Sequence, residues 1–423
     1  MLEYMKLEQV GLAPELRVDW AKRINLIAGD NGLGKSFLLD IAWWALTRTW
    51  AGPAALPDSK FKKPVIEYCI QGKTKKSPPV IAPFRRADQS WHIPPSRPNM
   101  PGIVIYIRID GGFSVWDPAR NYWRNDPGRP SAYHFDAKDV WDGLDIDGKR
   151  VCEGLERDWV NWQGGKKKQF NALEAVLKVL SPPQEQLRAG PPQRLFLGEG
   201  RERPTLMLGS QTIPVALASA GVRRILALVY FLVWAWYEHR AAAELLGKAP
   251  EERMVLLFDE PETHLHPRWQ RTVIPSLMEA LDVLRGTSKK TQFPQMMIAT
   301  HSPLVAASIE PVFDAELDDL IHLTVNASGT VAIEQGGWAT QGDATSWLTS
   351  QTFGLEQARS VEAEKAIEAA DALMRGERPI QAGLRSKTEI DKALRRLLPA
   401  SDPFWPRWVI RTRMPKRGTG EKK

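Results

Sequence analysis

The sequence is poor in cysteine: Cys69 and Cys152 are the only two among 423 residues. Two thiols cannot build the disulfide framework that small secreted domains need, so we expect a reducing, cytoplasmic setting. Residues 1–6 lack a basic stretch followed by an apolar core, so we expect no signal peptide. The longest apolar run, residues 225–237, is short for a bilayer and flanked by charges, so we expect no membrane contact.

Sustained heptads and internal repeats are also missing, which excludes a long coiled-coil arm or a repeat array. The chain also lacks a large excess of positive or negative charge: it has 57 Lys and Arg against 50 Asp and Glu. That balance permits contact with nucleic acid without requiring it. With 43% apolar and 25% charged residues, the composition is that of an ordinary globular protein long enough for two or three domains.

The most informative motif that is present spans residues 29–36 and fits G-x-x-x-x-G-K-S, the phosphate-binding P-loop. An apolar run at 24–28 precedes it and predicts a buried strand, and the apolar stretch 37–46 predicts a buried helix. In this context glycines let backbone N–H groups surround a phosphate at the helix N-terminus. A glycine-rich turn without a ligand is the alternative. The predicted nucleotide-binding residues are Gly29, Asn31, Gly32, Gly34, Lys35, Ser36 and Phe37.

Two later strand ends carry the polar groups that ATP chemistry requires. Residues 254–258 form an apolar run that ends in Asp259 and Glu260, and residues 295–299 form another that ends before His301. We predict that Ser36 and Asp259 hold Mg²⁺, that Glu260 takes a proton from the attacking water, and that His301 senses the γ-phosphate. By themselves these features would indicate only a charged strand end and a structural histidine.

A third candidate element is the helix start at Ser219, Ala220 and Gly221. A hydroxyl, a glycine and free helix N–H groups make an anion site, and an ordinary capped helix start is the alternative. His264 and His266 have the spacing of a metal pair, but no nearby cysteine completes a tetrahedral set, so a metal site is the less favoured interpretation.

Basic clusters and tryptophans leave a nucleic-acid surface open. A solvated face and core packing are the default interpretations, and phosphate contact and base stacking are the alternatives. The residues concerned are Lys73, Lys75, Lys76, Lys166, Lys167, Lys168, Arg201 and Arg203, together with Trp116, Trp123, Trp159 and Trp162.

The order of the predicted elements indicates an α/β fold with four segments. Residues 1–57 form an N-terminal lobe with the P-loop, and 58–193 form a strand-rich and helical insertion. Residues 194–335 form a C-terminal lobe, and 336–423 form a helical appendage with a basic tail whose last residues we expect to be disordered.

Together, these motifs resemble the ABC-type ATPases of the SMC, RecF and OLD group. Residues 262–267 look like the E-x-H-L-H-P segment of these proteins, and residues 300–303 look like their switch-histidine segment. The resemblance implies an ABC-type ATPase head that uses ATP and Mg²⁺. It also implies a homodimer or higher oligomer, formed only with ATP, in which the Ser219–Gly221 signature of one subunit caps the ATP of another.

A narrower resemblance, carried by residues 347–350, 353–355 and 359–364, is to the ATPase subunits of Septu and retron-associated anti-phage systems. It implies a separate effector, an HNH nuclease. The alternatives are a DNA-repair or DNA-end-binding ATPase and a scaffold that hardly turns over ATP. The chain departs from the group in a short signature, in the absence of a recognisable Toprim domain, and in an unplaced Q-loop glutamine, for which Gln71 and Gln89 are candidates.

Overall fold

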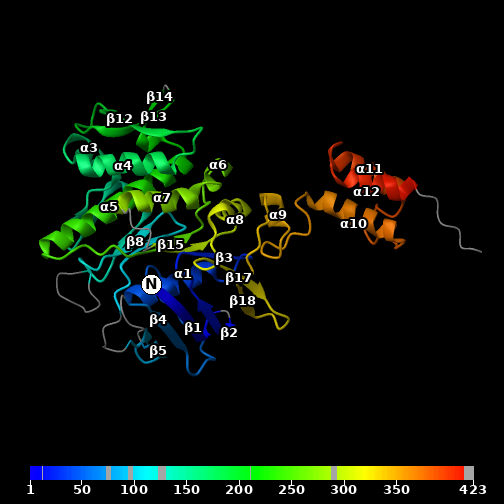
Figure 1. Ribbon diagram of the computed structural model, residues 1–423, viewed down its shortest axis with the longest axis horizontal. Coiled ribbons are helices and arrows are strands. Elements are labelled where there is room, and N and C mark those ends of the chain that lie inside the picture. Colours follow the sequence, from blue (N-terminus) through cyan, green and yellow to red (C-terminus); the bar gives the residue numbers. More distant parts are fainter. Residues whose placement is uncertain are drawn as a thin grey trace, which may run out of the picture. The chain divides into compact units, whose positions relative to one another are not determined.

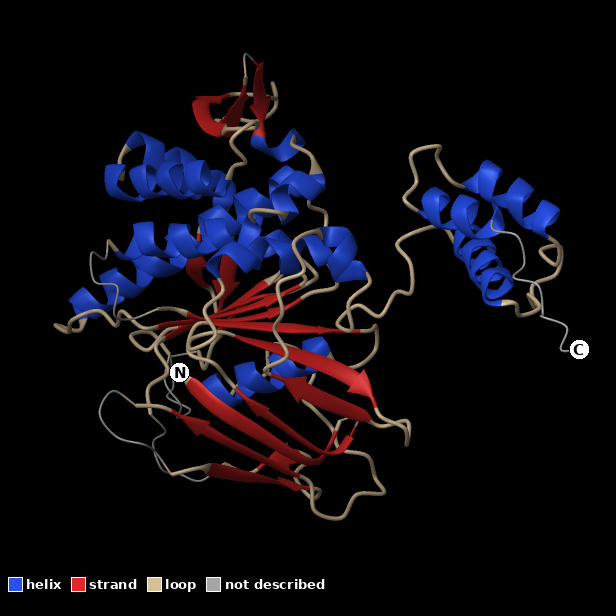
Figure 2. Ribbon diagram, turned by 45° about the vertical axis from the view of Figure 1, so that its right-hand side comes forward, coloured by secondary structure: helices blue, strands red, loops and turns tan. Residues whose placement is uncertain are grey.

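The computed structural model describes residues 1–11, 13–72, 78–93, 99–121, 130–209, 211–286 and 293–413. The chain divides into two compact units, Met1–Trp347 and Leu348–Lys423. All the predicted nucleotide-site residues lie in the first unit, whose arrangement is visible in Figures 1 and 2. The predicted α/β fold is confirmed in this unit by its mixed sheets and flanking helices.

The first unit is organised around a mixed sheet of eight strands (Figure 1). Its five neighbouring strands from β17 to β7 run parallel, and three strands at the edges are antiparallel. Because the parallel strands are covered on both faces, they are apolar along nearly their whole length. In order across the sheet, the strands are β18 (Val331–Gln335), β17 (Asp319–Val325), β3 (Ile24–Gly29), β16 (Gln295–Ala299), β15 (Met254–Asp259), β7 (Ile103–Ile107), β8 (Phe113–Trp116) and β9 (Tyr133–Phe135).

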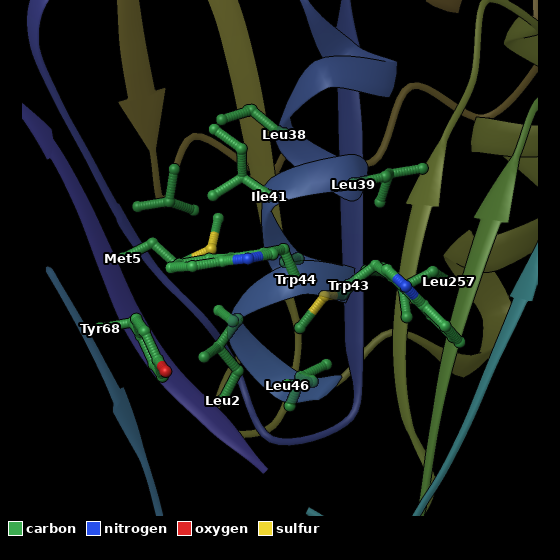
Figure 3. Close-up of a cluster of buried hydrophobic side chains, with 14 of the residues drawn as sticks. Leu2, Met5, Leu38, Leu39, Ile41, Trp43, Trp44, Leu46, Tyr68 and Leu257 are labelled. Atoms are coloured by element: carbon green, nitrogen blue, oxygen red, sulfur yellow. The ribbon is translucent and has the colours of Figure 1, made fainter. Parts of the chain in front are cut away.

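A second, antiparallel sheet lies across helix α1 (Lys35–Thr47) from the first (Figure 2). Trp43 points toward Leu257 of the large sheet, whereas Trp44 points toward Met5 and Tyr68 of the second sheet (Figure 3). The helix therefore buries both faces, which explains why its sequence is apolar on every side. The strands of the second sheet, in order, are β2 (Ala13–Asp19), β1 (Leu2–Val10), β4 (Val65–Ile70), β5 (Val80–Arg85) and β6 (Ser90–Trp91).

Helices cover the opposite face of the large sheet. The longest, α5 (Ala220–Leu245), is long enough and apolar enough to cross a membrane. However, 78% of its most apolar 18-residue stretch is buried inside the protein. Phe231 of α5 stacks on Phe113 of β8, which ties this helix to the sheet. The other elements of the unit are α2 (Ala137–Asp142), β10 (Leu144–Ile146), β11 (Lys149–Cys152), α3 (Leu155–Gly164), α4 (Lys167–Leu180), β12 (Leu187–Gln193), β13 (Arg203–Leu208), β14 (Gln211–Pro214), η1 (Val215–Leu217), α6 (Pro267–Gln270), α7 (Val273–Arg285), α8 (Pro303–Ile309), η2 (Glu310–Val312) and, at the junction with the second unit, α9 (Ala344–Leu348).

Residues 58–193, expected as an insertion, are partly integral to the two sheets. Strands β4 to β6 complete the second sheet, and β7 pairs in parallel with β15 in the large sheet. Strands as far apart in sequence as β7 and β15 pair because their buried apolar faces fit together. Local sequence patterns do not reveal such a fit.

The second unit contains a small helical core. Its helices are α10 (Val361–Arg375), α11 (Lys387–Leu397) and α12 (Phe404–Arg413). Helix α12 overlaps the basic tail expected at residues 405–423. It packs on the other helices because Phe404 and Trp408 lie four residues apart and both enter the core. Residues 414–423 lie outside the described part of the chain.

Candidate nucleotide-binding site

The P-loop joins β3 to α1 in the backbone conformation that the motif predicts. Gly32 and Gly34 have φ angles of 80° and 90°, which glycine adopts without strain. Gly29 has a φ of 142°, and a Cβ added there would meet the carbonyl oxygen of Leu323 at 2.5 Å. Asn31 is exposed, whereas the ring of Phe37 packs against Gly11, so Phe37 can reach a phosphate only through its backbone N–H.

Lys35 is only 5% exposed and points back over the loop. Its Nζ donates to the carbonyl oxygens of Gly29 (2.7 Å) and Asp30 (3.0 Å) and lies 3.3 Å from Nδ1 of His301. Burial lowers the pKa of Lys35, and the carboxylates of Glu260 and Asp259 act in the opposite direction. The amine is thus held at the centre of the loop, where the P-loop motif places a β/γ-phosphate.

Ser36 and Asp259 form the candidate Mg²⁺ site. The Ser36 hydroxyl donates to Oδ1 of Asp259 at 3.1 Å, so the P-loop and the end of β15 meet here. Asp259 is 2% exposed; burial, reinforced by Glu260 and Asp40, raises its pKa to about 6. A hydroxyl and a carboxylate beside a phosphate loop are the oxygen donors that Mg²⁺ prefers, so the donor set fits this ion.

His301 lies between the P-loop lysine and Glu260. Because an ammonium group only donates, Nδ1 of His301 is the acceptor toward Lys35, and the ring proton lies on Nε2. That Nε2 lies 3.4 Å from Oε1 of Glu260. Burial, followed by the charge of Lys35, lowers the pKa of His301, which favours the neutral ring. Glu260 has a φ of 48°, and its backbone N–H donates to Ala299 at 2.9 Å, which aligns the ends of β15 and β16.

Glu262, a member of the E-x-H-L-H-P segment, holds the segment that carries His301. Its Oε1 accepts hydrogen bonds from the Thr300 hydroxyl (2.8 Å) and from the backbone N–H of His301 (2.6 Å). Burial raises the pKa of Glu262. Only its place in the E-x-H-L-H-P segment could have drawn attention to Glu262, because its two partners lie 38 and 39 residues away.

The signature residues lie at the start of α5. Ser219 caps the helix by accepting from the N–H of Val222, and Ser219 and Ala220 are exposed. A Cβ added at Gly221 would meet the carbonyl oxygen of His264 at 2.7 Å, so α5 begins against the segment that follows Glu260. Within the described part of the chain, no hydrogen bond joins Ser219, Ala220 or Gly221 to the P-loop. Their predicted contact is with the nucleotide of another subunit.

The remaining candidates have other surroundings. His266 caps α6 through its Nδ1, which accepts from Arg268, and His264 is exposed. Among the described residues, no cluster of potential metal ligands includes either histidine. Gln71 follows β4, and Gln89 lies in the turn before β6, so neither stands on a strand of the large sheet.

The basic clusters and the tryptophans lie in different surroundings: some are paired or buried, and others are exposed. Arg201 and Arg203 pair with Glu156 and Glu199, whereas Lys166 to Lys168 lie exposed at the start of α4. Trp116, Trp159 and Trp162 are at most 3% exposed, so these three are core residues and not base-stacking platforms. Lys73, Lys75, Lys76 and Trp123 lie outside the described residues.

The fold and this arrangement define an α/β protein with a P-loop that is joined to an aspartate and a histidine from neighbouring strand ends. Residues 153–306 match the family model described as an AAA ATPase domain. The matched segment includes Asp259, Glu260 and His301, whereas the P-loop precedes it.

Among solved structures, the chain is similar to the SMC head domain from Thermotoga maritima, with 15% identity and a TM-score of 0.38 over 79% of this chain and 98% of that one. It is also similar to the recombination mediator protein RecF, with 12% identity and a TM-score of 0.39 over 80% and 98% of the two chains. A third match is an SMC head bound to the C-winged helix domain of ScpA, with 13% identity and a TM-score of 0.38 over 79% and 97%.

Proposed function

We propose that this chain binds ATP with Mg²⁺ and hydrolyses it to ADP and phosphate. The observation that carries the proposal is the meeting of Lys35, Ser36, Asp259, Glu260 and His301, from three segments of the chain, at the carboxyl ends of three adjacent parallel strands. Ligands of open α/β sheets bind at this edge. A bound Mg²⁺ would neutralise charge on the phosphates.

In this proposal each side chain has one task. Lys35 and the loop N–H groups bind the phosphates. Glu260 accepts a proton from the attacking water, and the neutral His301 donates a hydrogen bond from Nε2 to a γ-phosphate oxygen or to Glu260. Glu262 keeps the His301 backbone in register with β15. Ser219 and Gly221 of a second copy supply the N–H groups at the start of α5, so ATP favours the dimer because it contacts both subunits only in the closed state.

The finer proposal is that ATP-dependent dimerisation controls a separate effector, an HNH nuclease, as in anti-phage defence. It is supported by the tail motifs at residues 347–364 and by the separate helical unit, Leu348–Lys423, in which nearly all of these motif residues lie. The second candidate is a DNA-repair ATPase. The distribution of charge favours it. Residues 348–423 contain 16 Lys and Arg against 10 Asp and Glu, so this part of the chain carries a net charge of +6 out of +7 for the whole chain.

The test compares Glu260→Gln with wild type. Removal of the general base should lower kcat by about 10²-fold or more while the Kd for ATP changes little, and the ATP-bound variant should accumulate as a dimer. Lys35→Ala should instead abolish ATP binding. Unchanged hydrolysis by Glu260→Gln would contradict the role of Glu260.

Purification with co-expressed neighbouring gene products, with and without ATP, separates the two finer proposals. A stoichiometric nuclease partner supports effector control. A chain that purifies alone and binds duplex DNA only with ATP, with a steep salt dependence, supports the repair function.

A further inference from the structure

One carboxylate beside the candidate Mg²⁺ site has no task in the mechanism above. Asp40 lies on α1 four residues after Ser36. Residues four apart occupy the same face of a helix, about one turn along its axis, so Asp40 and Ser36 face the same side. Its hydrogen-bond donor Tyr106 lies on β7, which pairs in parallel with β15, the strand that ends in Asp259.

The environment of Asp40 contains a donor and no ion-pair partner. The Tyr106 hydroxyl, which is carried by β7 and buried, donates to Oδ1 of Asp40 at 3.0 Å. Arg108 acts electrostatically on Asp40, but its guanidinium donates to Asp110, Asp136 and the carbonyl oxygens of Ala51 and Phe135. Within the described residues no salt bridge includes Asp40.

A partly buried carboxylate without an ion-pair partner is unfavourable unless a positive charge lies beside it. Ser36 and Asp259 already mark where a divalent cation fits. Mg²⁺ retains several of its waters when it binds a phosphate site, and a carboxylate that accepts hydrogen bonds from those waters stabilises the ion.

We propose that the carboxylate of Asp40 holds the Mg²⁺ of bound ATP through a water in its coordination shell. The proposal rests on the proposed ATPase function, and it adds a metal-positioning residue that no motif identified. Tyr106 donates to one carboxylate oxygen, which leaves the other to accept a hydrogen bond from the water. Gln71 and Gln89, the candidates for a metal-sensing glutamine, both lie outside the large sheet. Asp40, in contrast, lies on α1, the helix that carries Ser36.

The test uses Mn²⁺ as the probe, since free Mn²⁺ is measured directly by electron paramagnetic resonance. Full-length wild type, Asp40→Asn and Tyr106→Phe are titrated with Mn²⁺ in the presence of a non-hydrolysable ATP analogue. Asp40→Asn keeps an oxygen that accepts from Tyr106 but removes the charge, and it should weaken Mn²⁺ binding about tenfold. Tyr106→Phe keeps the charge and removes the hydrogen bond, and its Mn²⁺ affinity should stay within about twofold of wild type.

Melting temperatures and the affinity for the analogue in EDTA show whether either variant is misfolded or has a damaged P-loop. Equal Mn²⁺ affinity for Asp40→Asn and wild type would overturn the proposal, and so would equal losses in both variants, because that pattern indicates a purely structural contact. Ser36→Ala serves as the positive control for lost metal binding. If wild type itself showed no analogue-dependent Mn²⁺ binding, the proposed ATPase function would fail, which is distinguishable from failure of the Asp40 role.

Discussion

Nδ1 of His301 lies 3.3 Å from the ammonium nitrogen of Lys35, and this contact adds to burial in favouring the neutral form of the histidine. A protonated ring would place a second positive charge beside Lys35 in a site that is already partly buried. Both effects lower the pKa of His301 from the usual 6.5, burial being the larger. The neutral ring is therefore the form that acts at neutral pH.

A pH titration of His301 tests this. We expect the ring to stay neutral in the folded protein at pH 6.5, with its midpoint below that value. Because an unfolded chain protonates at about 6.5, this residue contributes stability above that pH, and the contribution is lost as pH falls through the folded pKa. NMR of labelled histidines, with His301→Gln for assignment, gives the midpoint directly. A midpoint at or above 6.5 would contradict the inferred environment.

Substitutions at Glu262 separate its acceptor role from its charge. Glu262→Ala removes both hydrogen bonds that hold the segment of His301, and we expect kcat to fall about tenfold or more while the Kd for ATP stays within about threefold. Glu262→Gln retains an acceptor oxygen and should recover most of the activity. Steady-state kinetics and equilibrium ATP binding measure the two quantities. A Gln variant as impaired as the Ala variant would show that the charge matters instead.

Asp259 should reduce the stability of the nucleotide-free protein at neutral pH. Burial raises its pKa from 3.8 to about 6, so between those values the folded state binds the proton more strongly than the unfolded state does. Stability therefore declines as pH rises through this window, by up to about 3 kcal/mol. We expect Asp259→Asn to melt higher than wild type at pH 8, with the difference shrinking by pH 5. Scanning fluorimetry at both pH values, with Glu174→Gln on the exposed side of α4 as a matched control, checks this.

The exposed signature residue Ser219 offers a test of dimerisation. Ser219→Arg adds bulk where a second subunit is proposed to bind, so ATP-dependent dimers should disappear in light-scattering chromatography while the monomer still binds ATP. Loss of the helix cap costs about 1 kcal/mol in this variant. Ser219→Ala has the same loss without the bulk and therefore controls for it. Dimers of the arginine variant as abundant as those of the alanine variant would exclude this face from the interface.

Local patterns predicted much of the site and less of the fold. The P-loop, the strand end at Asp259 and Glu260, and the strand end at His301 were all identified, because each depends on a few consecutive residues with a strong backbone preference. The tryptophans were expected mainly in the core, and Trp116, Trp159 and Trp162 lie there. The placement of β7 in the large sheet and the helix α12 were not predicted, because both depend on partners distant in sequence.

The sequence by itself determined the phosphate loop, because glycine spacing and flanking apolar runs specify a strand, a turn and a helix start through short-range sterics and hydrogen bonding. Only the tertiary structure decided which side chains surround that loop. Glu262 reaches the His301 backbone across 39 residues, and Tyr106 reaches Asp40 across 66. Such contacts follow from the order of strands in the sheet, which is set by the packing of whole buried faces and not by any local pattern.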